Sequence, residues 1–412
     1  MKDRQDGFTL IELLIAMLVF VISLVLVSDF FTGQLTLFKQ QSKITESNIE
    51  GVIGLEILRR DIQDAGYGLP WSYQSSIDCS SGGCGEAIDA TASAYNDFPA
   101  NPPRAILTGN GVGFNGSDYL VVKGVSVGMS AASQKWTRLS MTPPSSNTAP
   151  GNPRIWDNPS DKLANTDYVT VLSLNGTATN RQLIVNGNIF STQYQNITSS
   201  PWPPADQSET RLVLGVDPDT SLRMPFNRAD YFIRRVDSSG NSITPARCAP
   251  GTGVLEKVVV SQTDGSFPAA SYMPLLDCVA DVQVIFGLDM DGDGVIGTYA
   301  AVDPDASKTT IVADSPYESE GKAANDVRAV FNDAALLRQY LKEVRVYVLT
   351  HEGQRDTSFL FPNSSILVGD SGIGATLGNN FNLAQKIGDP EYKYYRWKLY
   401  TIVTKPSNII SR

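Results

Sequence analysis

The residue types and spacing that most clearly suggest chemistry lie in one acidic, glycine-containing loop, residues 289–297. Carboxylates occupy its first, third and fifth positions and glycine its sixth, while the seventh residue, Val295, offers its backbone carbonyl. Oxygen ligands at alternate positions around a glycine turn form the arrangement that binds a hard cation such as Ca²⁺. The sequence therefore predicts a Ca²⁺ site whose side-chain ligands are Asp289, Asp291 and Asp293.

The predicted Ca²⁺ site is incomplete within the loop itself. The twelfth position, where a bidentate glutamate would complete the coordination, is Ala300. We expect a further ligand from Asp303, from Asp305 or from water, and the short ligand count predicts a weak dissociation constant of about 0.1 to 1 mM. The alternative interpretation is a turn that joins two strands without binding a metal.

Other patterns in the chain do not indicate an enzyme. Residues 111–116 have the spacing of a dinucleotide-binding fingerprint, but a predicted strand follows them where a helix would have to begin, so we interpret them as a turn. His351 is the only histidine, has no evident nucleophile partner, and is expected at the surface or at a strand edge. We therefore predict no catalytic activity.

One carboxylate lies inside an apolar stretch near the N-terminus. Residues 8–27 contain no basic side chain and a single acidic one, Glu12. A helix of that length covers about 30 Å, which is the thickness of a bilayer core. Because a charge at that depth costs about 3 kcal/mol, Glu12 is expected to need a partner.

The short basic leader indicates the direction of membrane insertion. Lys2 and Arg4 precede the apolar stretch, so the leader is expected in the cytoplasm and the chain beyond residue 31 is expected to be exported. The formal net charge is -10 and the chain has no long basic cluster. Direct binding to nucleic acid is therefore not expected.

The four cysteines would then lie in an oxidising compartment, where two disulfides with three possible connectivities can form. We expect local pairing, Cys79 with Cys84 and Cys248 with Cys278; the alternative is that they are buried free thiols. A mixed Cys/His zinc site is not expected, because neither pair has zinc-finger spacing and only one histidine is present.

A small residue, Gly7, precedes the apolar stretch in Gly-Phe-Thr-Leu-Ile-Glu-Leu-Leu, whereas a secretory signal peptide carries its small residues after the apolar core. This start resembles the class III signal of type IV pilins and of the pseudopilins of type II secretion. The resemblance implies that a prepilin peptidase cuts between Gly7 and Phe8 and methylates the new Phe8 amine. It also implies that Glu12 meets the terminal amine of a neighbouring subunit. An ordinary signal anchor is the alternative.

The apolar periodicity of a helix continues beyond the membrane to about Ala65, where Gly66, Gly68 and Pro70 end it. Two apolar rows are present: Leu37, Ile44, Gly51, Leu55, Leu58 and Ile62 form one, and Ile49, Ile53 and Ile57 form the other. One row is expected to pack on the protein's own sheet and the other to contact neighbouring subunits, unless both face the core. Gly33, Gly51 and Gly54 predict local bending.

After Trp71 the sequence changes to short β-type runs separated by loops rich in Pro, Ser, Asn and Gly. The predicted strands cover residues 119–122, 168–174, 183–185, 212–215, 231–235, 254–260, 279–286, 344–349 and 399–403. A single helix is expected over residues 325–342. The insertions between strands are large enough to form a second β-rich lobe.

Several segments resemble the large minor pilins called PilW-like. These segments are the acidic helix end at residues 58–68, the strand after Asp118, the strand and acidic loop from residue 279, and the strands at 343–349 and 394–403. The resemblance implies an α+β pilin fold, with a long N-terminal helix packed on antiparallel sheet and an enlarged β-rich head. The Pro-rich insertion at residues 143–161 has no counterpart in that family.

The expected organisation is a cleaved leader at residues 1–7, a membrane-spanning and filament-core helix at 8–31, its amphipathic continuation at 32–68 and an exported head at 69–412. The resemblance implies a minor pilin that takes part in type IV pilus assembly, in a tip or priming complex. The alternatives are a type II pseudopilin of the J or K kind, whose tip complex also binds calcium, and an adhesin or ligand-binding head whose loops expose Trp71, Trp136, Trp156 and Trp202.

The partners implied are other pilins and minor pilins, the prepilin peptidase, and the inner membrane before assembly. The protein would then be part of a pilus or pseudopilus at the cell surface.

Overall fold

The computed structural model describes residues 9–73, 77–79, 83–141, 152–153, 156–174, 181–303, 310–312, 320–374 and 376–409. The predicted leader, the cleavage position between Gly7 and Phe8, the candidate ligand Asp305 and most of the insertion at residues 143–161 lie outside the described residues.

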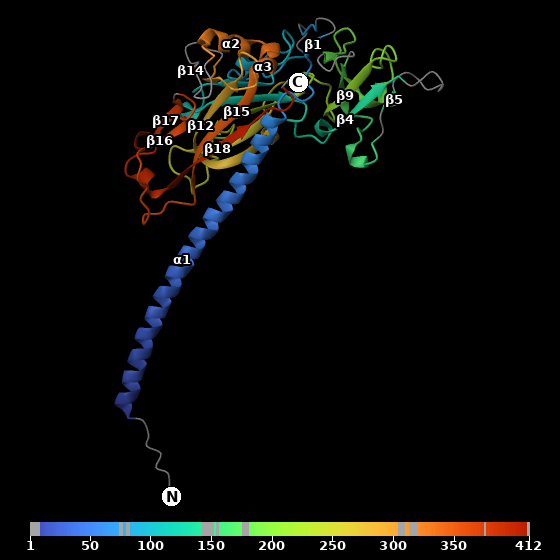
Figure 1. The fold of residues 1–412 in the computed structure, drawn as a ribbon. Helices are drawn as coiled ribbons and strands as arrows, with labels where there is room; N and C mark the ends of the chain where they lie inside the picture. The colour runs from blue at the N-terminus through green and yellow to red at the C-terminus, as the bar shows by residue number, and fades with distance from the viewer. Residues whose placement is uncertain are drawn as a thin grey trace.

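One long helix, α1 (Leu10–Gln63), dominates the shape of the molecule and extends far beyond the head (Figure 1). Its 54 residues correspond to about 80 Å of helix. Thr9 caps its start, and the chain turns away at Gly66, where a φ of 82° ends the helix in the left-handed region. The predicted single helix is confirmed. It runs unbroken through Gly33, Gly51 and Gly54.

The two predicted apolar rows of α1 have different environments. Gly51, Leu55, Leu58 and Ile62 are buried against the head, whereas the side chains of Leu37 and Ile44 lie outside the description. Ile49 is 57% exposed and Ile53 is 60% exposed. The first row therefore packs on the protein's own sheet, mainly on β12 (Tyr272–Leu288), β15 (Leu341–Glu352) and β18 (Arg396–Thr404). Most of the second row faces outward.

Among the described residues, the sheet beneath α1 has nine strands, and all their pairings are antiparallel. Its central path runs β14 (Thr310–Val312), β13 (Thr298–Ala301), β12 (Tyr272–Leu288), β11 (Gly253–Val259), β10 (Asn227–Arg234), β3 (Tyr119–Gly124) and β2 (Ile106–Gly109). The long strand β12 also pairs with β15 (Leu341–Glu352), which in turn pairs with β18 (Arg396–Thr404).

A second sheet, with seven strands in the part of the chain that the structure describes, forms the lobe on the far side of the helix end (Figure 1). Its order is β1 (Ser72–Tyr73), β7 (Gln182–Leu183), β6 (Tyr168–Ser173), β9 (Thr210–Asp217), β4 (Trp136–Ser140) and β5 (Asn152–Pro153), with β8 (Thr192–Gln193) on β6. The predicted second β-rich lobe is thus present, and each predicted strand overlaps an observed one.

The remaining elements are small and cover the main sheet. A hairpin of β16 (Ser365–Asp370) and β17 (Leu377–Asn382) with α4 (Leu383–Lys386) packs on the face opposite α1. The predicted single helix at residues 325–342 is wrong: it is α2 (Ala324–Asn332) followed by α3 (Ala334–Tyr340). Asp333 separates them. Its backbone is extended, which interrupts the helix, and its carboxylate caps the start of α3.

Candidate functional site

The N-terminal part of α1 is the first candidate site, because it is apolar and makes no contact with the head. Residues Leu10–Thr32 form a 23-residue segment, none of it buried, that is long and apolar enough to cross a membrane. Within it Glu12 completes a capping box: its Oε2 accepts hydrogen bonds from the backbone N–H of Thr9 at 3.0 Å and from the Thr9 hydroxyl at 2.9 Å. Glu12 thus has a local partner, and its role in assembly stays a prediction.

The acidic loop follows β12 directly, as its sequence indicates. Asp289 is 1% exposed, and its two carboxylate oxygens accept the N–H groups of Gly292 at 2.7 Å and Gly294 at 3.1 Å. Asp291 and Asp293 are exposed, and each accepts the backbone N–H two residues further on. These bonds hold the loop closed around its glycines.

The third carboxylate near this loop is Glu320, which sequence reasoning missed. One ligand oxygen from each of Asp289, Asp291 and Glu320 lies within 4.8 Å of the others, and neither Asp293 nor Asp303 belongs to that group. Glu320 is held by the Met290 N–H at 2.8 Å and by the Thr298 hydroxyl at 2.5 Å. Asp303 instead accepts the Asn110 N–H at 2.8 Å.

A glycine in the loop makes room for Glu320. A Cβ placed on Gly297 would lie 2.5 Å from the Glu320 side chain, so any larger residue there would displace the carboxylate. Three carboxylates form a donor set that suits a hard cation. The Lys342 ammonium lies 3.8 Å from Asp289 and would compete with the cation for that carboxylate. The residues present therefore fit a divalent cation with oxygen ligands.

Both expected disulfides are present. Cys79 is bonded to Cys84 and Cys248 to Cys278, with Cα–Cα separations of 5.2 Å and 4.9 Å. The first closes a loop before the main sheet, and the second ties the loop before β11 to β12.

His351 is a core residue, and its expected place at the surface or at a strand edge is wrong. It is 1% exposed in β15, between β12 and β18, and packs beside the rings of Tyr395 and Trp397. Its Nε2 accepts the Ala249 N–H at 2.8 Å. Burial lowers the pKa of His351 to about 3, so the ring is neutral.

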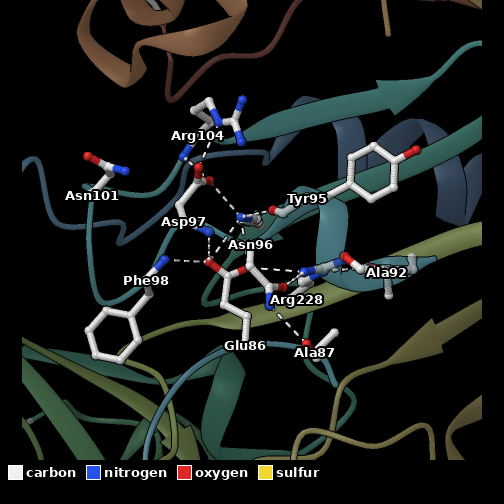
Figure 2. A network of polar contacts seen from close by, with 12 residues as sticks. Glu86, Ala87, Ala92, Tyr95, Asn96, Asp97, Phe98, Asn101, Arg104 and Arg228 are labelled. Carbon is white, nitrogen blue, oxygen red and sulfur yellow. Dashed lines mark hydrogen bonds and ion pairs between the residues drawn. The ribbon is translucent and has the colours of Figure 1, made fainter. Parts of the chain in front are cut away.

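A buried network of charged side chains is the second group that sequence reasoning missed (Figure 2). Glu86 accepts the N–H groups of Asp97 and Phe98 at 2.8 Å each, and it pairs with Lys123 at 2.7 Å and Arg228 at 3.1 Å. Lys123 and Arg228 are both 0% exposed. Their nearest acids balance them, since Lys123 also pairs with Asp97 and Arg228 with Asp230.

This network has the properties of a structural element rather than a reactive site. Every charged group named in it has an opposite charge within ion-pair distance, and it lies between the loop before β2 and the strands β3 and β10. The sequence signal that could have revealed it is Lys123, a charged residue at the end of the apolar run 120–122.

The four loop tryptophans are not a free aromatic surface. Trp202 is 5% exposed, and Trp136 and Trp156 are half-buried against each other, with ring centroids 4.8 Å apart. Trp71 is half-buried directly before β1. These positions remove the observation on which an adhesin interpretation rested.

Comparison with known proteins identifies the N-terminus. Residues 2–28 match the family model described as the prokaryotic N-terminal methylation motif. A solved type IV-like pilin from Thermus thermophilus aligns with 88% of this chain and 98% of its own, at 9% identity and a TM-score of 0.28. A score of that size does not establish a common fold for the head. No curated protein matches the chain.

The motif and the exposed apolar helix define a protein with a prepilin-type N-terminus that is suited to membrane anchoring. The chain therefore combines this N-terminal methylation motif with an α+β architecture and a β-rich head.

Proposed function

We propose that this protein is a minor pilin that takes part in type IV pilus assembly. Its leader would stay in the cytoplasm, its head would be exported from the inner membrane, and the prepilin peptidase would act between Gly7 and Phe8. The observation that carries the proposal is the single uninterrupted α1. Its first 23 residues lie fully outside the head, and its last turns pack on the face of the main sheet.

Two features of the head support a place at the tip rather than as the repeating subunit. The second sheet makes the head wide beside the helix end (Figure 1), which would obstruct close helical stacking of identical copies. Near the head, the apolar residues of α1 that face outward are Ile49 and Ile53 of the second row and the nearby Val52, here called the outward row. They leave apolar surface for neighbouring pilins. A subunit at the tip has neighbouring pilins on one side only, so one apolar surface on α1 would be enough for its contacts.

Deletion of the gene and complementation test this function. Loss of the protein should sharply reduce pilus number and twitching, and the wild-type gene should restore both. Glu12→Val should be made and inserted but should fail to restore pili, because it lacks the carboxylate that meets a neighbour's terminal amine. Asp29→Asn, which changes an acid in the same helix, serves as the control. Normal piliation in the deletion strain would refute the priming role.

A type II secretion pseudopilin of the J or K kind is the second candidate, because the same N-terminus and a large head suit both systems. Neighbouring genes for pilus or for secretion components separate them. A secretion defect with intact pili in the deletion strain would favour the pseudopilin.

We also propose that the Asp289 loop binds Ca²⁺, with Glu320 supplying the ligand that the loop lacks. The convergence of Asp289, Asp291 and Glu320 supports this assignment. Calorimetric titration of the full chain should give a dissociation constant of about 0.1 to 1 mM. Glu320→Gln should weaken binding at least tenfold. Asp237→Asn, in an acidic turn that lies outside this carboxylate group, should not. Absence of Ca²⁺ heat would leave the loop as a turn.

A further inference from the structure

The only histidine of the chain lies beside one of the two cysteine pairs. Cysteine spacing in the sequence argues against a mixed Cys/His metal site, but the fold brings these residues together. The sulfurs of Cys248 and Cys278 and one ring nitrogen of His351 all lie within 4.8 Å of one another. Two sulfurs and one imidazole nitrogen are a donor set that suits Zn²⁺.

The three residues come from separate segments that the main sheet brings together. Cys278 belongs to β12, His351 to the neighbouring strand β15, and Cys248 to the loop before β11. Cys278 and His351 are each 1% exposed, and the rings of Tyr395 and Trp397 pack on the imidazole. Cys248 is half-buried, so the group can be reached from solvent at this residue. Enclosed, apolar surroundings of this kind limit the access of water to a metal ion.

His351 makes only one side-chain hydrogen bond among the described residues. Its Nε2 accepts the Ala249 N–H at 2.8 Å, so Nε2 carries the lone pair of the neutral ring and points at the residue that follows Cys248. Its Nδ1 is buried and has no hydrogen-bond partner there, and the Glu352 backbone lies near the ring without hydrogen-bonding geometry. Most buried polar side-chain atoms are paired. A metal ion would therefore have to displace a single hydrogen bond to take this lone pair.

Cys278 is held in a backbone conformation that cysteine rarely adopts. Its φ is 59°, in the left-handed region, and among the described residues other than glycine only Asn115 shares this property. The pairing of β12 also shifts register here, against β11 between Leu276 and Val279 and against β15 between Val279 and Asp281. Backbone of this kind persists where packing enforces it, and it is concentrated at functional sites. The irregular stretch of β12 thus coincides with the Cys/His group.

The disulfide has to be opened before these sulfurs can bind a metal, because the thiolate is the metal ligand. A dithiol reductant supplies the two electrons: one of its sulfurs attacks a cysteine sulfur to form a mixed disulfide, and its second thiol then releases that cysteine. The products are two cysteine thiols and the oxidised reductant. A Zn²⁺ ion that binds both sulfurs releases their two protons, so the complex carries no net charge. The neighbouring Arg247 is already paired with Asp277, at 2.8 Å.

We propose that Cys248, Cys278 and His351 bind Zn²⁺ when their disulfide is reduced, with the fourth tetrahedral position left to water. Disulfide and metal exclude each other at this site, because both use the same sulfurs. The redox state of one cysteine pair thus decides whether the loop before β11 is joined to β12 by a covalent bond or by a metal ion.

Titration with Co²⁺ tests the site, because Co²⁺ accepts the tetrahedral geometry of Zn²⁺ and its thiolate complexes absorb in the near ultraviolet. The full chain in detergent, reduced and then freed of reductant under nitrogen, should show this absorption, and Zn²⁺ should remove it. The oxidised chain should not show it. The Cys79→Ser/Cys84→Ser variant keeps the site and should bind as the reduced wild type does, whereas Cys248→Ser should lose the absorption.

His351→Gln separates a three-ligand site from a simple dithiol. The glutamine amide oxygen can still accept the Ala249 N–H, but the imidazole lone pair is gone. The dissociation constant for Zn²⁺ should rise at least about tenfold, since even changes outside the ligand shell cost about that much.

Alkylation resolved by mass spectrometry keeps the test independent of the variants. In the reduced wild type, Zn²⁺ at about tenfold excess over its dissociation constant should slow alkylation of Cys248 about tenfold and leave Cys79 and Cys84 unchanged. Ca²⁺ should have no effect, because hard cations prefer oxygen ligands. The proposal is overturned if the reduced wild type binds no Co²⁺, if the Cys79→Ser/Cys84→Ser variant loses the binding, if His351→Gln binds Zn²⁺ as the wild type does, or if Zn²⁺ protects all four cysteines alike.

Discussion

At the scale of single residues, Glu86 holds together the largest set of buried charges. It contacts Lys123 and Arg228, both fully buried, and two backbone N–H groups. Glu86→Gln keeps the shape but leaves the two cations with one counter-charge fewer. The free energy of unfolding should fall by about 3 to 5 kcal/mol.

Urea unfolding of the full chain measures this loss. Glu391→Gln, which breaks the more exposed pair with Arg355, is the control and should cost about 1 kcal/mol or less. Equal losses in the two variants would mean that the buried network contributes no more than a surface pair.

Asp281 makes the stability of the head depend on pH. It lies in the middle of β12 and is 0% exposed, and it accepts hydrogen bonds from Gln283 at 2.9 Å and Asn379 at 2.8 Å. Burial raises the pKa of Asp281 to about 7. The unfolded chain loses this proton near pH 3.9. The raised pKa therefore adds to the free energy of unfolding. This contribution is complete below about pH 3.9 and is lost as the pH rises through about 7.

Asp281→Asn removes this titration, because an amide stays neutral and both partner amides can rotate to suit it. The variant should melt above the wild type at pH 8, and the difference should shrink towards pH 5. Melting temperatures at pH 5, 6, 7 and 8 test this, with the exposed Asp237→Asn as control. A constant difference across that range would contradict the assignment.

At the scale of elements, the contact between α1 and β12 depends on Gly54. A Cβ on Gly54 would lie 1.7 Å from the Leu275 carbonyl oxygen, so Gly54→Ala forces the helix away from the strand. The free energy of unfolding should fall by about 1 to 3 kcal/mol, despite the better helix propensity of alanine.

Gly51→Ala is the matched control three residues earlier. There the added Cβ is crowded by the flexible Cδ1 of Leu276, at 2.9 Å, while the Tyr400 hydroxyl at 3.8 Å is in ordinary contact. The gain of about 1 kcal/mol in helix propensity offsets the crowding. Its melting temperature should stay near that of the wild type. If both variants lost the same stability, close approach at Gly54 would not be the reason for its glycine.

At the scale of the whole molecule, the outward row of α1 should matter for assembly and not for folding. Ile53 is 60% exposed beside a groove of about 390 Å³ formed with Met273 and Pro274. Ile53→Asp should leave the melting temperature of the head unchanged and lower the amount of protein in sheared pili several-fold, because it puts a charge into an apolar contact.

Val403→Asp is the control, since Val403 is 50% exposed on β18 and lies outside this row. Immunoblots of sheared pili and of membranes give, for each variant, the ratio of protein in pili to protein in membranes. A normal ratio for Ile53→Asp would assign the row to the solvent rather than to a neighbouring subunit.

Much of the architecture follows from the sequence, because it depends on short-range patterns. The apolar run around Glu12, the helical period up to Ile62 and the alternation in the strands are read over a few residues at a time. The same holds for the pairing of Cys79 with Cys84 and for the Asp289 turn, whose groups are a few residues apart.

Only the tertiary structure brought together groups that no local pattern connects. Glu320 reaches the loop at Asp289, Arg228 reaches Glu86, and His351 reaches the pair of Cys248 and Cys278. The break at Asp333 and the burial of His351 were decided in the same way. Charge balance and burial depend on which strands become neighbours, and that is set by packing over the whole chain.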